Sequence, residues 1–164
     1  MENSIERIGM AQWYVGKAPG IITTIGLGSC VGLTLYDPIT KIGGVLHLML
    51  SDSTKFSYSQ NINRAKFADT GIRDMYDNML EMGANKSNLV AKIAGGAQMF
   101  AIKEGNDMLN IGARNIEATE QTLGELNIPI LGSDVGETYG RTIELDLEDG
   151  SLKVITVNRD IKMI

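Results

Sequence analysis

The chain has only one cysteine, Cys30, and only one histidine, His47, among its 164 residues. A single cysteine excludes a disulfide within the chain, which favours a reducing compartment. No apolar run approaches the roughly 20 residues that a membrane-spanning helix needs. The first residues lack the basic start and the continuous apolar core of a signal peptide. We therefore expect a cytoplasmic protein with no membrane insertion.

Positive charge is also scarce, because 15 Lys and Arg residues against 20 Asp and Glu residues give a formal net charge of −5. No cluster of basic residues stands out, and nucleic-acid binding normally needs one. One cysteine and one histidine make a poor set of zinc ligands, and the lysine-containing spacing of a phosphate-binding loop is missing. The sequence predicts no nucleic-acid partner, no metal site and no cofactor.

The hydrophobic pattern predicts one α/β domain over residues 1–164, with a strand-rich N-terminal half. Apolar residues at helical spacing predict helices over 62–82, closed by Gly83, and over 111–126. Pro38 directly after Asp37 predicts a hairpin turn over 37–41, and the polar segment 51–61 predicts an exposed loop. The expected strands are 8–15, 21–27, 31–36, 42–50, 89–94, one beginning near 128–131, 141–147 and 152–157.

Cys30 and His47 are the one pair in the chain that could act as nucleophile and base. A thiol attacks as the thiolate, and an imidazole is its usual activator. If the hairpin pairs symmetrically around residues 38 and 39, Cys30 lies opposite a residue near 47, beside the histidine. The spacing alone is equally consistent with a buried, inert cysteine and a structural histidine.

Glycines at 26 and 28 shape the loop that precedes Cys30. Glycine permits a positive φ and a close approach of the backbone to another group. We expect this loop to leave the Cys30 side chain at a sheet edge. The amides of Gly28, Ser29 and Cys30 would then be donors for an oxyanion.

A third residue should hold the imidazole in one tautomer. The strands that flank the pair contain no Asp or Glu, and Thr24 on the adjoining strand offers a hydroxyl. Thr23 points to the opposite face if that strand is regular. Spacing alone also allows a purely structural threonine.

Four ordered blocks of the sequence resemble the CheD family, the chemoreceptor glutamine deamidases of chemotaxis. The first block is Thr24-Ile25-Gly26-Leu27-Gly28-Ser29-Cys30-Val31, continued by Asp37-Pro38, Lys41-Ile42-Gly43-Gly44 and His47. The others are residues 92–99, Ile111-Gly112-Ala113-Arg114-Asn115, and Asp134-Val135-Gly136 with Gly140-Arg141. The resemblance extends over residues 8–157, nearly the whole chain.

This resemblance implies that Cys30 is the nucleophile, His47 the general base and acid, and Thr24 the residue that holds His47. It implies an α/β layered sandwich of mixed β-sheet with flanking helices, similar to the cysteine deamidases of the bacterial toxin type. The implied substrates are glutamine side chains on chemoreceptor cytoplasmic helices, converted to glutamate with release of ammonia. The implied partner is CheC, a phosphatase of the chemotaxis response regulator.

Two residues near these blocks raise separate expectations. Phe100 follows a Gly-Gly-Ala turn and is a candidate anchor for receptor or CheC, with a core phenylalanine as the alternative. Glu137 stands where the family usually has a second glycine, so it is strained if that position needs φ > 0.

Two other functions compete with the deamidase. One is a non-catalytic module that binds receptor and regulates CheC. The other is a thiol redox sensor, which would need an external thiol because the chain has no second cysteine.

Overall fold

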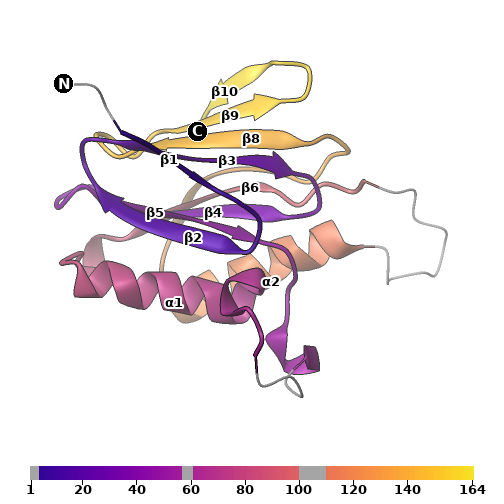
Figure 1. Cartoon of the computed structure of the whole chain (residues 1–164), viewed down its shortest axis with the longest axis horizontal. Helices are drawn as coiled ribbons and strands as arrows, with labels where there is room; N and C mark the ends of the chain where they lie inside the picture. Colours follow the sequence, from indigo (N-terminus) through magenta and orange to yellow (C-terminus); the bar gives the residue numbers. More distant parts are fainter. Residues whose placement is uncertain (1–3, 57–60, 100–109) are drawn as a thin grey trace.

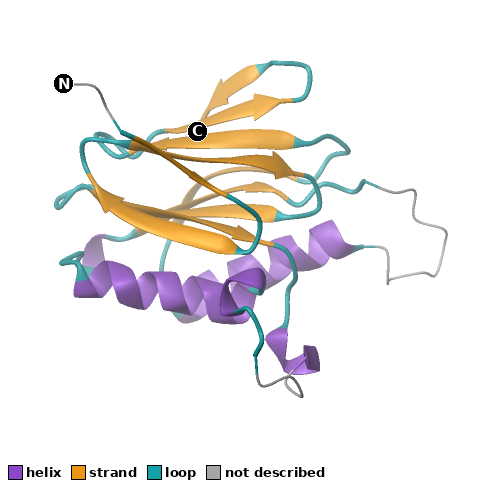
Figure 2. Ribbon diagram, viewed as in Figure 1, coloured by secondary structure: helices purple, strands orange, loops and turns teal. Residues whose placement is uncertain are grey.

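The computed structural model describes residues 4–56, 61–99 and 110–164. Two five-stranded β-sheets lie one above the other, and two helices cover the outer face of the second sheet (Figure 1). The colouring by element type separates the strand layers from the helix layer (Figure 2). The predicted α/β layered sandwich of mixed sheet with flanking helices is confirmed.

The first sheet is held together by pairings between distant parts of the chain. Its strand order is β1-β3-β8-β9-β10, with β1 parallel to β3 and the other pairs antiparallel. The strands are β1 (Ile5–Ile8), β3 (Ile21–Leu27), β8 (Arg141–Asp146), β9 (Leu152–Thr156) and β10 (Ile161–Met163).

The second sheet contains the predicted hairpin at its centre. Its strand order is β2-β5-β4-β6-β7, with β6 parallel to β7 and the other pairs antiparallel. The strands are β2 (Gln12–Lys17), β5 (Ile42–Leu48), β4 (Val31–Asp37), β6 (Val90–Gly95) and β7 (Ile130–Val135). All residues of β4 and β5 are buried, because one face meets the helices and the other meets the first sheet.

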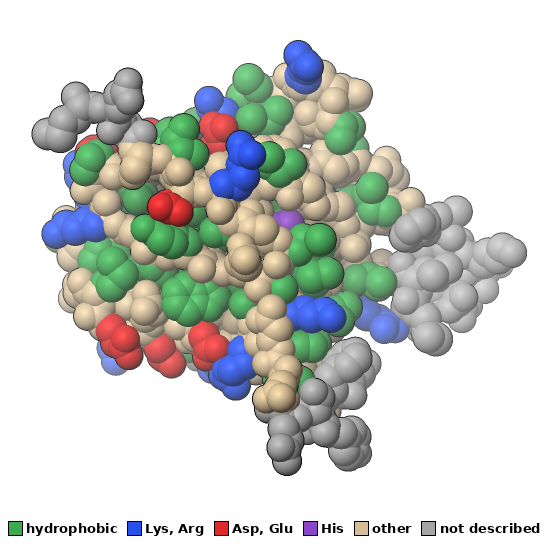
Figure 3. Space-filling model, viewed as in Figure 1, with side chains coloured by type: hydrophobic (Ala, Val, Ile, Leu, Met, Phe, Trp, Pro, Cys, Tyr) green, Lys and Arg blue, Asp and Glu red, His purple; other side chains and the backbone are tan. Residues whose placement is uncertain are grey.

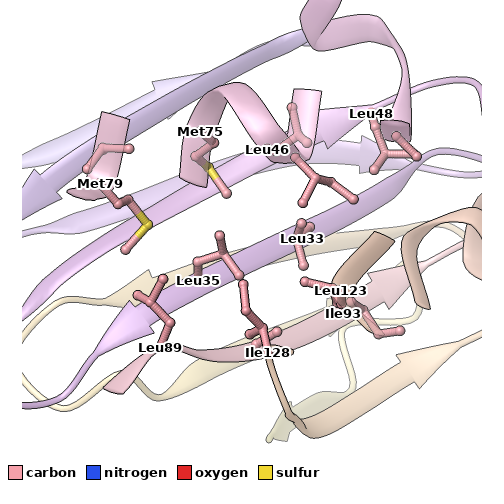
Figure 4. Close-up of a cluster of buried hydrophobic side chains, with 14 of the residues drawn as sticks. Leu33, Leu35, Leu46, Leu48, Met75, Met79, Leu89, Ile93, Leu123 and Ile128 are labelled. Atoms are coloured by element: carbon pink, nitrogen blue, oxygen red, sulfur yellow. The ribbon is translucent and has the colours of Figure 1, made fainter. Parts of the chain in front are cut away.

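The helices α1 (Ala68–Glu81) and α2 (Ile111–Glu125) pack their apolar stripes on the second sheet. Met75 and Met79 of α1 and Leu123 of α2 meet leucines of β4 and β5 (Figure 4). Short 3-10 turns occupy Ser53–Phe56, Arg64–Lys66 and Lys86–Asn88. A second core fills the space between the two sheets, with Ile22, Leu27, Val45 and Ile143 among its members.

The boundaries differ from the expected ones where the backbone leaves its regular path. The expected strand 8–15 is two strands, because the chain turns at Ala11, which has φ 58°. The first helix begins at Ala68 rather than at 62, because Arg64–Lys66 form a 3-10 turn and Phe67 is extended and bridges to Leu50. The strand β10 was not expected; it is short and exposed.

The described part of the chain has no helix that is both long and apolar enough to cross a membrane. On the face shown in Figure 3, lysine and arginine side chains are scattered among acidic and apolar ones.

Candidate active site

The predicted hairpin positions His47 in the middle of the second sheet. Its turn is fixed by Asp37, whose Oδ1 accepts hydrogen bonds from the amides of Ile39 (2.9 Å) and Thr40 (3.3 Å). The central strands then pair in register, with Gly32 of β4 opposite His47 of β5. The His47 side chain is completely buried.

Cys30 lies directly before β4, in the cluster that fills the space between the sheets. The expectation that it lies at a sheet edge is wrong, because β4 is the central strand of its sheet and Cys30 is only 8% exposed. Since Gly32 pairs with His47, Cys30 falls opposite Met49, two residues from the expected register. Side chains alternate along a strand, so the thiol and the imidazole are on the same face of the sheet.

Gly32 gives the facing sheet room beside His47. A Cβ atom at this position would lie 2.6 Å from Ile143 Cδ1 and 2.9 Å from Leu27 Cδ1. Both contacts are closer than real side-chain packing allows. The glycine therefore lets the two sheets approach each other at the imidazole.

Thr24 reaches His47 from the first sheet. Its Oγ1 lies 2.7 Å from His47 Nδ1, and both side chains have no exposed surface. Thr24 is in β3, so it faces His47 across the sheet interface and does not lie on a hydrogen-bonded neighbour of β4 or β5. The hydroxyl of Thr23 donates to the Ile143 carbonyl (2.8 Å), so only Thr24 contacts the imidazole, as expected.

The hydrogen bonds of Thr24 determine the tautomer of His47. A threonine hydroxyl has one proton to donate, and that of Thr24 goes to the carbonyl of Ile8 at 3.0 Å. The contact with Nδ1 is then one in which Nδ1–H donates to Thr24 Oγ1. The proton of the neutral imidazole is thus on Nδ1, and Nε2 carries a lone pair. Among the described residues Nε2 has no hydrogen-bond partner, so its lone pair is free to accept a proton.

Burial keeps both groups uncharged at neutral pH. It lowers the pKa of His47 to about 4, because the interior disfavours the imidazolium. Burial also raises the pKa of the Cys30 thiol, while the backbone amide of Cys30 itself acts in the opposite direction. At neutral pH the resting groups are therefore a thiol and a neutral imidazole.

Two of the three expected oxyanion donors remain available. The amide of Gly28 donates to the Gly26 carbonyl (3.1 Å), so its inclusion among the donors is wrong. In the described part of the chain, the amides of Ser29 and Cys30 donate to no backbone carbonyl. These two N–H groups directly precede the Cys30 side chain along the chain, and they are the better candidates for oxyanion donors.

Other expected residues have different outcomes. Phe100 lies outside the described residues. Glu137 has φ 58°, so its position does require the left-handed conformation. Within residues 4–56, 61–99 and 110–164, no group of three or more His, Cys, Asp or Glu side chains is placed to hold a metal ion.

One residue beside the site received no role from the sequence. Asn115 of α2 is fully buried, and its Nδ2 donates to the carbonyls of Ser29 and Met49, both at 2.9 Å. The one feature of the sequence that could have indicated a role for Asn115 is its place at the end of the block 111–115, which resembles the CheD family.

Comparison with known proteins connects this geometry to a family. The family described as CheD chemotactic sensory transduction matches residues 49–156. That match begins two residues after His47, so the cysteine and histidine are spanned by full-length relatives instead.

Those relatives are similar to the chain over nearly its whole length. A "Probable chemoreceptor glutamine deamidase CheD" of Caldanaerobacter subterraneus subsp. tengcongensis is 54% identical over 164 residues, which is 100% of both chains. A "Chemoreceptor glutamine deamidase CheD" of Halalkalibacterium halodurans is 46% identical over 162 residues, 99% of each chain. Another of the same name, from Bacillus licheniformis, is 45% identical over 99% of this chain and 96% of its own length.

A solved structure shows a weaker likeness. The crystal structure of the Bacillus licheniformis hypothetical protein YfiH is 16% identical, with a TM-score of 0.48. The match covers 74% of this chain and 49% of that one.

Proposed function

The chain belongs to the CheD family, and on that basis we propose that it is a protein-glutamine amidohydrolase acting on chemoreceptors. It converts glutamine side chains to glutamate with release of ammonia. The observation that carries this proposal is the buried contact between Thr24 and His47, which leaves the lone pair of His47 Nε2 on the sheet face shared with Cys30.

Each residue has one chemical task in the proposed reaction. His47 Nε2 takes the Cys30 proton, and Sγ forms a bond to the amide carbon of the glutamine side chain. The N–H groups of Ser29 and Cys30 hold the oxyanion. His47 then returns the proton to the leaving nitrogen, the C–N bond breaks, and ammonia departs.

A second half-reaction restores the enzyme. His47 takes a proton from water, and the hydroxide attacks the thioester carbon. The C–S bond breaks, the thiolate regains the proton, and the glutamate side chain is released. Thr24 holds the imidazole in the Nδ1–H tautomer through both stages.

The partner and the compartment are part of the same proposal. The family resemblance supports a CheC-type phosphatase as the partner and the cytoplasm as the compartment, where chemoreceptor helices are accessible. Phe100 remains a candidate contact for the receptor or for CheC. We propose no cofactor and no metal, because Cys30, His47 and Thr24 supply the nucleophile, the base and its orientation.

The proposal is tested by incubating the purified protein with chemoreceptor cytoplasmic fragments. Ammonia release and the mass gain from glutamine to glutamate are measured, the latter by peptide mass spectrometry. Cys30→Ala and His47→Ala should both stop turnover while circular dichroism shows an intact fold. Thr23→Val is the matched control, because Thr23 bonds to Ile143 and does not contact His47. Normal turnover by folded Cys30→Ala or His47→Ala would overturn the cysteine mechanism, whereas no turnover by the wild type would favour the non-catalytic module.

A further inference from the structure

The loop that carries Cys30 is held by its carbonyl groups. Each of three successive carbonyls accepts one hydrogen bond: Gly28 from the Ala97 amide (2.8 Å), Ser29 from Asn115 Nδ2 (2.9 Å) and Cys30 from the Gly96 amide (2.8 Å). Two of these donors are backbone groups of the segment after β6. The third is a side chain, and it holds the peptide between Ser29 and Cys30.

Holding the carbonyls also orients the amides. In a trans peptide the N–H of one residue points away from the C=O of the residue before it. The bond to the Ser29 carbonyl therefore directs the Cys30 N–H to the opposite side, away from Asn115. This N–H acts on the sulfur of its own residue, where it favours the thiolate against the larger effect of burial.

Asn115 joins this peptide to the strand of the base. Its second Nδ2 hydrogen goes to the carbonyl of Met49, two residues after His47. Both neighbours are carbonyl oxygens, so the amide nitrogen must face them. One buried side chain thus fixes the distance between the end of β5 and the loop before β4.

The helix that carries Asn115 is itself held tightly against the loop after β6. A Cβ atom at Gly112 would lie 2.5 Å from the carbonyl oxygens of both Gly96 and Ala97. A larger residue would push α2 away, and Asn115 with it. Gly112 lets the start of α2 lie directly on the segment that also bonds to the cysteine loop. It therefore keeps Asn115 close enough to bond to that loop.

We propose that Asn115 is a positioning residue of the active site, which holds the Cys30 N–H toward the oxyanion and the thiol and ties it to the strand of His47. This role rests on the proposed deamidation. Asn115 makes and breaks no covalent bond; it acts through the Ser29–Cys30 peptide.

The test compares Asn115→Leu with Thr122→Val. Leucine has nearly the shape of asparagine and no charge, so it removes both donors without adding an electrostatic effect. Thr122 is also buried in α2, and its hydroxyl donates to Ala118 within the same helix. Asn115→Ala is the second variant, for use if leucine prevents folding. Melting temperature establishes which variants are folded.

Two readouts separate positioning from general stability. The kcat for ammonia release should fall about 100-fold in Asn115→Leu, as when one oxyanion donor is lost, while KM changes less than about threefold. Alkylation of Cys30 by iodoacetamide without substrate should slow by about threefold or more at pH 8, because the amide no longer favours the thiolate. Thr122→Val should match the wild type in both.

Different outcomes would contradict the positioning role of Asn115 and the proposed deamidation. A folded Asn115 variant whose kcat and alkylation rate both match those of Thr122→Val overturns the positioning role. If the wild type releases no ammonia from any receptor fragment, the deamidase proposal fails, and the alkylation rates alone decide whether Asn115 positions the Cys30 amide.

Discussion

Thr24 of the first sheet and His47 of the second form a hydrogen bond of 2.7 Å across the interface between the sheets. Neither side chain is reached by solvent. The orientation of the His47 imidazole therefore depends on the packing of the two sheets, and it is fixed only once both sheets have formed. A substitution that keeps the shape of Thr24 but removes its hydroxyl can therefore separate its hydrogen bond to His47 from its packing in the core.

Thr24→Val should lower kcat by about tenfold or more while the protein stays folded. Valine has the shape of threonine but cannot accept a hydrogen bond from Nδ1–H. The imidazole then loses the fixed tautomer that general base catalysis needs. Thr24→Ser keeps the hydroxyl and should retain most of the activity. The measurement is steady-state ammonia release, with Thr23→Val as the control on the same strand. Equal rates for the two valine variants would remove Thr24 from the site.

Alkylation of the substrate-free protein should report a thiol, not a thiolate. The rate with iodoacetamide should rise with pH through the neutral range without a plateau, since burial raises the pKa of Cys30. His47→Gln should change this profile less than about threefold, because no preformed ion pair is lost. A neutral-pH plateau that disappears in His47→Gln would show a thiolate–imidazolium pair instead.

The parts of the site that could be predicted from sequence are local. The hairpin between Cys30 and His47 follows from a turn sequence and two apolar runs, and its register was missed by only two residues. The end of the first helix follows from Gly83, which has φ 112°. Such features depend on neighbours in the chain, which a sequence displays directly.

The remaining parts depend on contacts between distant residues. The partners of β3 are β1 and β8, more than a hundred residues apart from each other, so no local pattern shows that Thr24 lies in the facing sheet. The buried position of Cys30 has the same origin, because the first sheet covers it. The two bonds of Asn115 join a helix to a loop and a strand that precede it by 86 and 66 residues.

Glu137→Gly should stabilise the protein by about 1 kcal/mol, because a left-handed conformation is costly for any residue with a Cβ atom. Glu137 has φ 58° and an exposed side chain. Its carbonyl accepts the Gln98 amide at 2.8 Å, a bond that glycine keeps. Urea unfolding measures the change, and Thr138→Gly, at a neighbouring position without positive φ, should destabilise instead. A loss of stability in Glu137→Gly would mean that the carboxylate makes a compensating interaction.

The pH dependence of stability should reveal the buried histidine. In the unfolded chain His47 titrates near its ordinary pKa of 6.5, and in the folded protein burial lowers this pKa to about 4. Between these values the unfolded state binds a proton that the folded state does not, so the free energy of unfolding falls as the pH decreases. The contribution is complete above pH 6.5 and lost below about pH 4, and it amounts to about 3 kcal/mol.

The comparison of wild type with His47→Gln isolates this contribution from that of the carboxylates, which both proteins share. Urea unfolding at pH 7 and pH 5 should show that the wild type loses about 2 kcal/mol more than His47→Gln between the two. The difference arises because glutamine takes up no proton in either state. Parallel pH profiles would mean that His47 is protonated as easily in the folded protein as in the unfolded chain. An imidazole that titrates so readily would be open to solvent, and His47 would not be the buried, uncharged group that the structure shows.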